Sequence, residues 1–247
     1  MISLKGKTIL VVDDEKGYRE VLSDEFRMVD ATVIAAENGT KAFEIAQFQK
    51  IDAIVSDVRM AGGTGVDLLD QIKALNPDTP VVMLITGYSD LSAEDAYDRG
   101  AEAIFSKPCN LDLLVEAVYR AILPERDRWV HQLEYLPSDF TVELEAASLG
   151  GAITARILSL GRGGMFVVLD GTPPAMGTRV GFQMSPPHSH QQSFEGIGIC
   201  RWSRMNSESG LPSGMGVEFC SLTDESLDAL SEILKILRPK AFIPKKI

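Results

Sequence analysis

Cysteine is scarce in this sequence, and its few cysteines form no recognisable pattern. The 247 residues contain three, Cys109, Cys200 and Cys220. Their spacing fits neither a disulfide framework nor a zinc site. We therefore expect free thiols and no structural metal held by cysteine.

Long apolar runs and a secretory signal are also missing. No apolar stretch approaches the roughly 20 residues that a membrane-spanning helix needs. The first residues, "MISLKGKTILVVDDE", pass from a short polar start into a strand-like run, without the apolar region and small-residue cleavage site of a signal peptide. We expect a soluble, cytoplasmic protein that does not insert into a membrane.

Positive charge is in short supply. The formal net charge is −11, and it is unevenly spread. Residues 1–124 carry 12 Lys and Arg against 21 Asp and Glu, a net of −9, and residues 125–247 carry 12 against 14, a net of −2. Neither half has the basic surface that binding to a phosphate backbone requires, so we expect no DNA binding.

The chain is long enough for two domains, and its first half alternates between two patterns. Five apolar runs are each followed by a stretch with helical spacing, which predicts a doubly wound α/β domain over residues 1–123 with a five-stranded parallel sheet. Thr40 is the expected N-cap of the second helix and Gly100 the expected end of the fourth. The expected strands are 7–14, 32–39, 52–57, 79–87 and 103–107, and the expected helices 15–29, 40–49, 65–75, 92–100 and 110–122.

The second half has a different pattern. Residues 124–137, bounded by two prolines and rich in charge, are the expected linker to a domain over residues 138–247. Six short strands separated by Gly, Pro and Ser clusters predict an all-β barrel or sandwich. An amphipathic helix over 224–237 follows, with Thr223 as its N-cap. The expected strands are 140–147, 151–160, 164–170, 177–185, 194–203 and 214–221.

Five residues with reactive side chains fall at strand ends in the first half. Carboxyl ends of parallel strands meet at one edge of the sheet, where ligands of doubly wound folds bind. Clustered carboxylates repel one another unless a divalent cation lies among them, and magnesium prefers such ligands. A carboxylate can accept a phosphoryl group, and an ammonium and a hydroxyl can stabilise it. Taken singly, each residue could be a helix cap, a turn residue or a solvated charge. Taken together, they favour a site for phosphoryl transfer. The five residues are Asp13, Asp14, Asp57, Thr86 and Lys107.

Four segments of the first half resemble the successive motifs of a CheY-like response-regulator receiver domain, over about residues 4–123. They are "ILVVDDE", "IVSDVRMAGGTGVDLL", "LITGYSD" and "GAEAIFSKP". The resemblance implies that Asp57 is the phosphoacceptor.

The same resemblance assigns a role to each neighbouring residue. It implies that Mg²⁺ (or Mn²⁺) is bound directly by Asp14 and Asp57 and through water by Asp13, with the backbone carbonyl of Arg59 as a further ligand. Thr86 and Lys107 would contact the phosphoryl group. Pro108 would follow Lys107 in a cis peptide bond.

Two departures from the family fall on the face of the receiver domain that normally passes its signal to a partner. The family usually has Tyr or Phe three residues before the Lys, whereas this sequence has Ile104 there, and we expect Phe105 on the opposite face of the strand. The usual coupling of an aromatic switch to Thr86 is therefore not expected. The segment 86–100 is also one residue shorter than is common, so the fourth helix is expected to be short or shifted.

The second half resembles a PilZ domain over about residues 127–238. The resemblance rests on four segments that follow one another before a helix: "TARILSLGRGGMFV", "GTRVGFQM", "GICRW" and "GMGVEF". That family is a six-stranded barrel that commonly binds cyclic di-GMP through Arg-x-x-x-Arg and Asp/Asn-x-Ser-x-x-Gly. No two arginines here are four apart. Ser159, Gly161 and Gly164 stand at the Asp, Ser and Gly positions. We therefore do not expect cyclic di-GMP binding of the usual kind.

Other arginines of the second half could form an anion site, although solvated cations at strand edges are the simpler interpretation. Trp202 and Phe194 are expected in the core of the barrel rather than on a stacking surface. The candidate anion-binding residues are Arg156, Arg162 and Arg201.

The leading hypothesis is a phosphorelay response regulator. A sensor histidine kinase would phosphorylate Asp57, and the second domain would signal to an unidentified downstream protein, with homodimer formation allowed. It would not be an enzyme beyond Mg²⁺-dependent self-phosphorylation and slow autodephosphorylation. A cyclic di-GMP receptor modulated by the first domain is the alternative. A hydrolase with an aspartyl-phosphate intermediate is disfavoured, since Arg59 stands where a second carboxylate is needed.

Overall fold

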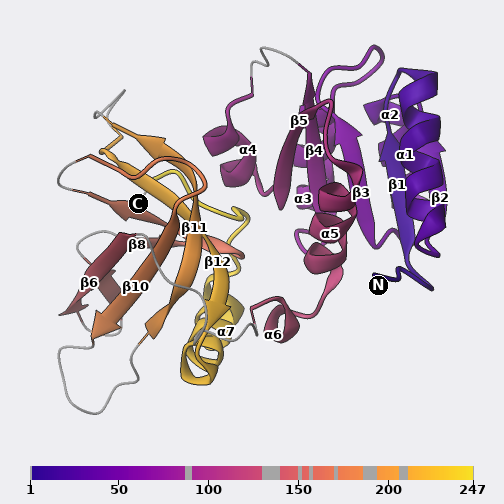
Figure 1. Cartoon of the computed structure of the whole chain (residues 1–247). Helices are drawn as coiled ribbons and strands as arrows, with labels where there is room; N and C mark the ends of the chain where they lie inside the picture. Colours follow the sequence, from indigo (N-terminus) through magenta and orange to yellow (C-terminus); the bar gives the residue numbers. More distant parts are fainter. Residues whose placement is uncertain are drawn as a thin grey trace. The chain divides into compact units, whose positions relative to one another are not determined.

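The computed structural model describes residues 2–86, 91–129, 140–149, 152–155, 158–169, 172–185, 194–205 and 211–246. The chain divides into two compact units, Met1–Leu123 and Pro124–Ile247. Figure 1 colours them from indigo to magenta and from magenta to yellow. The expected linker 124–137 stays a prediction, because residues 130–139 lie outside the described part of the chain.

The first unit is built on one parallel sheet. Its five strands lie in the order β2-β1-β3-β4-β5, and every neighbouring pair is parallel. This confirms the doubly wound fold class expected from the alternation of apolar runs and helical patterns. The strands are β1 (Thr8–Val12), β2 (Thr32–Ala36), β3 (Ala53–Asp57), β4 (Val81–Thr86) and β5 (Ala103–Lys107).

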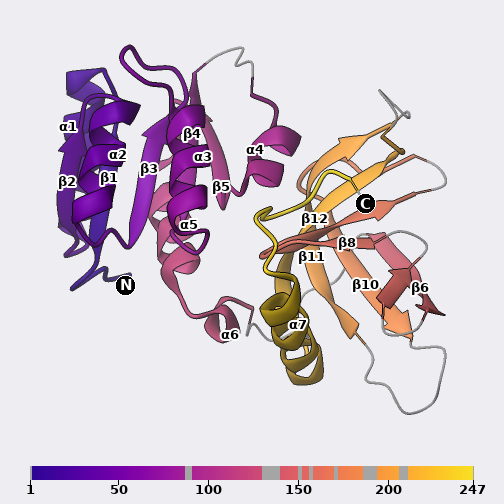
Figure 2. The same ribbon diagram turned by 180° about the vertical axis from the view of Figure 1, so that it is seen from behind.

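Helices cover both faces of this sheet, as Figures 1 and 2 show from opposite sides. Leu22 and Phe26 of α1 share one apolar cluster with Leu114 of α5 and the strand residues of one face. Helices α2, α3 and α4 share the cluster on the other face. The helices are α1 (Lys16–Met28), α2 (Gly39–Phe48), α3 (Gly65–Leu75), α4 (Ala93–Arg99) and α5 (Leu111–Ile122).

The helix ends test three expectations. The expected cap at Thr40 is wrong: α2 begins at Gly39, and the side chain of Asn38 accepts a hydrogen bond from the backbone N–H of Lys41 at 2.9 Å. Gly100 ends α4 in the left-handed conformation, at φ 105°, as expected. Helix α4 has seven residues and is the shortest of α1–α5.

The two residues at the departure from the receiver pattern lie on opposite faces of β5. Ile104 packs with the cluster that holds α2, α3 and α4, and Phe105 packs with the cluster that holds α1 and α5. This agrees with the expected alternation of side chains along a strand. No aromatic side chain of β5 therefore lies on the face of Ile104.

The second unit contains one sheet of seven strands in the order β7-β6-β10-β11-β12-β9-β8. The expected strand 151–160 is divided into β7 and β8, which lie at opposite ends of this order. All pairs are antiparallel except β6 with β10. Closure into a barrel stays a prediction. The strands are β6 (Phe140–Leu149), β7 (Ala152–Ala155), β8 (Leu158–Leu160), β9 (Gly164–Val168), β10 (Arg179–Ser185), β11 (Phe194–Arg204) and β12 (Gly214–Leu222).

Helix α7 (Asp224–Leu237) packs on this sheet as the sequence pattern indicates, and the hydroxyl of Thr223 caps it. Leu227, Leu230 and Leu234 are buried, whereas Leu237 at the end of the helix is 58 % exposed. No helix among the described residues has the length and apolar character to cross a lipid bilayer.

The core of the second unit begins inside the expected linker. A short helix, α6 (Glu125–Arg128), precedes Trp129, which is buried. The ring of Trp129 packs edge to face against the ring of Phe219, with centroids 5.9 Å apart. The backbone carbonyl of Trp129 accepts a hydrogen bond from the N–H of Leu222. Phe194 and Trp202 are buried in the same unit, as expected.

Candidate functional site

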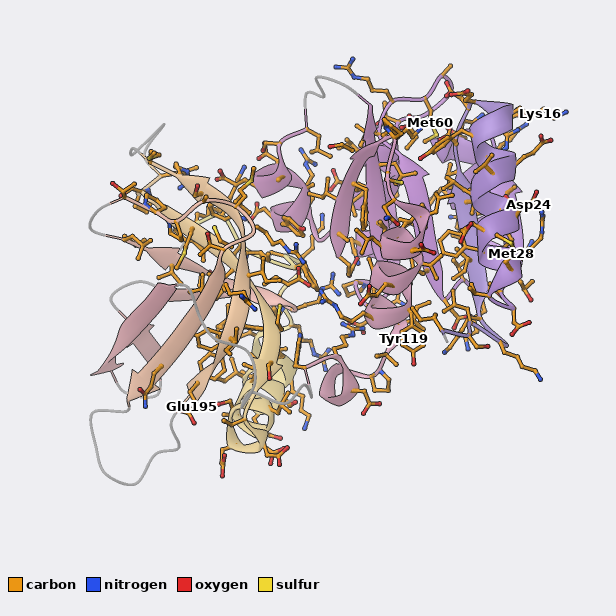
Figure 3. The ribbon with its side chains drawn as sticks, viewed as in Figure 1. Lys16, Asp24, Met28, Met60, Tyr119 and Glu195 are labelled. Carbon is orange, nitrogen blue, oxygen red and sulfur yellow. The ribbon has the colours of Figure 1, made fainter. Side chains whose placement is uncertain are left out.

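The predicted site residues of the first unit follow strands that lie side by side. Asp13 and Asp14 come after β1, and Asp57 ends the neighbouring strand β3. Thr86 ends β4 and stands opposite Lys107, which ends β5. Figure 3 labels Met60, which lies in the loop after β3 at this carboxyl edge. The sheet therefore places all five residues at one edge, next to the point where strand order reverses.

Asp57 is a buried carboxylate with a partner on each oxygen. Its exposed fraction is 3 %. Oδ2 accepts a hydrogen bond from the backbone N–H of Arg59 at 3.1 Å, and Oδ1 lies 2.8 Å from Nζ of Lys107. Helix α3 starts close by, because a Cβ at Gly65 would lie 2.0 Å from the carbonyl oxygen of Asp57. Glycine at position 65 thus permits this close approach.

Asp13 shares the same ammonium. It is fully buried, and its Oδ2 accepts a hydrogen bond from Nζ of Lys107 at 2.6 Å. Its Oδ1 accepts another from the backbone N–H of Glu15 at 2.9 Å. The Lys107 side chain, 12 % exposed, therefore lies between two buried carboxylates.

The charge of Lys107 is stabilised by these neighbours. Burial lowers the pKa of its ammonium, but the hydrogen bonds to Asp13 and Asp57 and their negative charges raise it, and the net effect is a raised pKa. Lys107 therefore stays protonated at neutral pH.

The other carboxylate, Asp14, is exposed and contacts the loop after β3. Its Oδ2 accepts a hydrogen bond from the backbone N–H of Ala61 at 3.2 Å. Among the described residues, no three Asp, Glu, His or Cys side chains converge closely enough to form a ready metal site. The ammonium of Lys107 lies between Asp13 and Asp57 instead.

Three further expectations have different outcomes. The Lys107–Pro108 peptide bond is cis, as the resemblance implied. The side chain of Thr86 lies outside the described part of the chain, so its contact with a phosphoryl group stays a prediction. The use of the Arg59 carbonyl as a metal ligand also stays a prediction.

Two residues beside Lys107 were not predicted from the sequence, Tyr18 and Cys109. The ring of Tyr18 faces Nζ of Lys107, which lies 4.6 Å from the ring centroid, and its hydroxyl lies 3.4 Å from Sγ of Cys109. The sequence places Tyr18 within the expected helix 15–29 and gives it no role in the site. Tyr18 lies five residues after Asp13, near the start of α1, and no sequence pattern marks its contact with Lys107.

Two of the three candidate arginines contact other groups of the second unit. Nε of Arg201 donates a hydrogen bond to the carboxylate of Glu218, which is buried. Arg162 is also buried, and its Nε donates to the carbonyl of Lys240 at 3.3 Å. Arg156 lies outside the described residues. An anion site formed by these three arginines stays a prediction.

The turn between β8 and β9 binds a segment from the end of the chain, residues 239–245, which we call the strap. The N–H groups of Arg162 and Gly163 donate to the carbonyls of Ala241 and Phe242 at 2.9 and 3.0 Å. Phe242 and Ile243 are buried, and Figure 2 shows the yellow trace running back along the sheet after α7.

Glycines make room for the strap. A Cβ at Gly163 would lie 2.0 Å from the ring of Phe242, and one at Gly161 would lie 2.4 Å from the Phe242 carbonyl oxygen. Arg204 adds a hydrogen bond to the carbonyl of Lys245 at 3.1 Å. The strap therefore occupies the turn at which the PilZ ligand motif was sought in the sequence.

Relatives and solved structures resemble the first unit. A cyclic di-GMP phosphodiesterase of Thermotoga maritima is 34 % identical over 125 residues, 50 % of this chain and 32 % of the relative. The DNA-binding transcriptional regulator NtrC of Escherichia coli is 38 % identical over 115 residues, 46 % of this chain and 24 % of the relative. The chain thus spans about a third or less of the length of these relatives. A receiver domain structure from Clostridium thermocellum aligns with 27 % identity and a TM-score of 0.44, over 47 % of this chain and 94 % of that one.

Family models cover both units. The response regulator receiver domain model matches residues 9–119, and the PilZ domain model matches residues 127–235. The order of the two matches agrees with the order expected from the sequence motifs. The chain therefore carries a response regulator receiver domain followed by a PilZ domain.

Proposed function

We propose that this chain is a response regulator that accepts a phosphoryl group on Asp57 from a sensor histidine kinase and signals through its PilZ domain to a protein partner. The observation that carries the proposal is the ammonium of Lys107, held 2.8 Å from Asp57 and 2.6 Å from Asp13 in a buried position. Receiver and PilZ domains are signalling domains, so catalysis of other substrates is not part of the proposal. The location proposed for this reaction is the cytoplasm.

The transfer needs only a nucleophile and a fixed positive charge on the protein side. An oxygen of Asp57 attacks phosphorus, and the bond from phosphorus to the imidazole nitrogen of the donor histidine breaks, with the electron pair going to the imidazole. The product is an acyl phosphate on Asp57. Lys107 stabilises the negative charge on the transferred oxygens, because its ammonium is already beside the acceptor.

The donor atoms at this edge suit magnesium. Asp13 and Asp57 offer buried carboxylates and Asp14 an exposed one, and hard oxygen ligands are those that Mg²⁺ prefers. These three residues, with the carbonyl of Arg59, would hold the ion. When bound, Mg²⁺ (or Mn²⁺) would neutralise charge on the phosphoryl oxygens.

A protein partner, rather than cyclic di-GMP, is proposed for the PilZ domain. Arg162 and Arg201 contact the strap and Glu218, and the strap covers the turn of the ligand motif. The N-terminal part of the family signature falls near residues 130–139, outside the described part of the chain. The expected homodimer and the expected lack of DNA binding stay predictions of the sequence.

Radiolabelled acetyl phosphate tests the phosphorylation proposal. In the presence of Mg²⁺, the full chain should incorporate acid-labile, base-labile label, and Asp57→Asn should incorporate none. Asp78→Asn is the control, because Asp78 is exposed in the loop before β4. Label that persists in Asp57→Asn would refute the assignment of the acceptor.

Calorimetric titration of the full chain with cyclic di-GMP tests the alternative. We expect no heat of binding up to high micromolar ligand. Saturable binding with one site per chain would reverse this part of the proposal and favour a cyclic di-GMP receptor.

A further inference from the structure

We propose that Tyr18 is a positioning residue for phosphoryl transfer: its ring holds the ammonium of Lys107 beside Asp57, and Cys109 holds the ring. This inference rests on the proposed function, since it adds to the site a residue that touches neither the acceptor nor the donor. Tyr18 acts through Lys107 alone. The three residues come from α1, from the end of β5 and from the loop before α5.

The ring lies at the distance of a cation–π contact. Nζ of Lys107 is 4.6 Å from the ring centroid of Tyr18, within the roughly 6 Å over which a cation is attracted to an aromatic face. The Lys107 side chain is only 12 % exposed, so water screens this attraction weakly. Among the described residues, the ammonium thus contacts two carboxylates and one ring.

The ring is the uncharged member of these three neighbours, and its contact does not depend on the state of Asp57. Phosphorylation changes the carboxylate of Asp57, whose Oδ1 lies 2.8 Å from Nζ, whereas it leaves the Asp13 carboxylate, at 2.6 Å, unaltered. Without a further contact, Asp13 would compete for the ammonium during the reaction. The face of Tyr18 restricts that movement and also excludes water from one side of Lys107.

Tyr18 is itself fixed at its far end. Its hydroxyl lies within hydrogen-bond distance of the Cys109 thiol, at 3.4 Å, and Cys109 follows Lys107 by two residues. Burial and this contact with Cys109 raise the pKa of Tyr18 above its ordinary value of 10.0. The ring therefore stays a neutral phenol, with no charge that would draw Nζ away from the carboxylates.

Three variants of the full chain separate the ring from the hydroxyl. Tyr18→Leu removes the aromatic face and should lower the rate of labelling by acetyl phosphate about fivefold, the effect of losing a partly buried cation–π contact. Tyr18→Phe keeps the face and should retain at least half of the wild-type rate. Tyr119→Leu is the matched control. Figure 3 shows Tyr119 on α5, far from the carboxyl edge marked by Met60.

A double-mutant cycle distinguishes positioning from a general structural effect. In a Lys107→Ala background, Tyr18→Leu should slow labelling no further, because the ring then has no ammonium to hold. An equal additional loss in that background would overturn the inference, as would a Tyr18→Leu rate equal to that of the wild type. Thermal unfolding of each variant checks that the first unit remains folded.

Failure of the inference and failure of the proposed function give different results. If the wild type takes no label, or Asp57→Asn still takes it, the proposed function is wrong. If the wild type is labelled on Asp57 and Tyr18→Phe loses as much rate as Tyr18→Leu, the face of the ring does not position Lys107, and only this inference is wrong.

Discussion

Two buried lysine–carboxylate pairs lie at opposite ends of the receiver sheet, and their surroundings differ. Lys107 contacts Asp13 and Asp57 at the carboxyl edge and is 12 % exposed. Lys73 contacts Glu102 at 2.7 Å before β4 and β5 begin, and their side chains are 0 % and 2 % exposed. The side chain of Lys107 is partly accessible to an incoming group, whereas the side chains of Lys73 and Glu102 are shielded from solvent. The first therefore suits the proposed phosphoryl transfer, and the second suits a role in stability.

Glu102→Gln should destabilise the receiver unit by about 3 kcal/mol, because it leaves the buried ammonium of Lys73 without its counter-charge. The carbonyls of Thr79 and Pro77 still accept hydrogen bonds from Lys73, which limits the loss. Urea unfolding measures the change. Glu44→Gln, an exposed position on α2, should alter stability by less than about 0.5 kcal/mol. Equal midpoints for the two variants would contradict the role of this pair.

Cys200 should be the slowest of the three cysteines to react with iodoacetamide at pH 8. It is buried, and burial raises the pKa of its thiol, so less of the reactive thiolate is present at that pH. Cys109 and Cys220 are partly exposed and serve as internal controls. Mass spectrometry over time gives the order. Labelling of Cys200 should accelerate in urea, and equal rates for all three in the native chain would contradict its burial.

At the scale of elements, periodic apolar patterns in the sequence predicted the strands and helices of the first unit. Apolar runs that end in Asp57 and Lys107 predicted where two strands end. Because the carboxyl ends of parallel strands share one edge of a sheet, the position of the candidate site could be predicted from the sequence. The sequence placed Tyr18 only within the expected helix 15–29, because its contact with Lys107 joins residues 89 positions apart. No local pattern encodes such a contact.

The strap shows the same limit in the PilZ unit. Residues 239–245 have no helical or strand period, and their contacts are with a turn about 80 residues earlier. The glycines of that turn were compared with a ligand motif, whereas Gly161 and Gly163 make space for Phe242. The division of the expected strand 151–160 was missed for a related reason, since a continuous apolar pattern does not reveal a change of partner strand.

Gly163→Ala should loosen the strap. The added Cβ would lie 2.0 Å from the ring of Phe242, so the ring must move out of its buried position. Limited trypsin digestion of the full chain should then cleave after Lys240 several-fold faster than in the wild type. Gly17→Ala is the matched control, because a Cβ there meets nothing within 4 Å. Unchanged cleavage in Gly163→Ala would show that the turn does not hold the strap.

At the scale of the whole molecule, each unit has its own hydrophobic core. Phe26 is fully buried among residues of the first unit, and Phe219 is buried among residues of the second. Two separately cooperative units are therefore expected, and an event at the receiver site should first affect the stability of the receiver unit.

Magnesium should stabilise only the unit that contains Asp13 and Asp57. Calorimetric unfolding of the full chain should show two transitions, and Phe26→Ala should identify the receiver by lowering one of them. A ligand at 100 times its dissociation constant stabilises by about 2.7 kcal/mol, so Mg²⁺ in that excess should raise the same transition and leave the other unchanged. Asp13→Asn should remove most of this shift, since it removes a buried carboxylate that is proposed to hold the ion through water, whereas Asp78→Asn should retain it. A Mg²⁺ shift confined to the PilZ transition, or one that survives in Asp13→Asn, would place the ion away from the carboxyl edge.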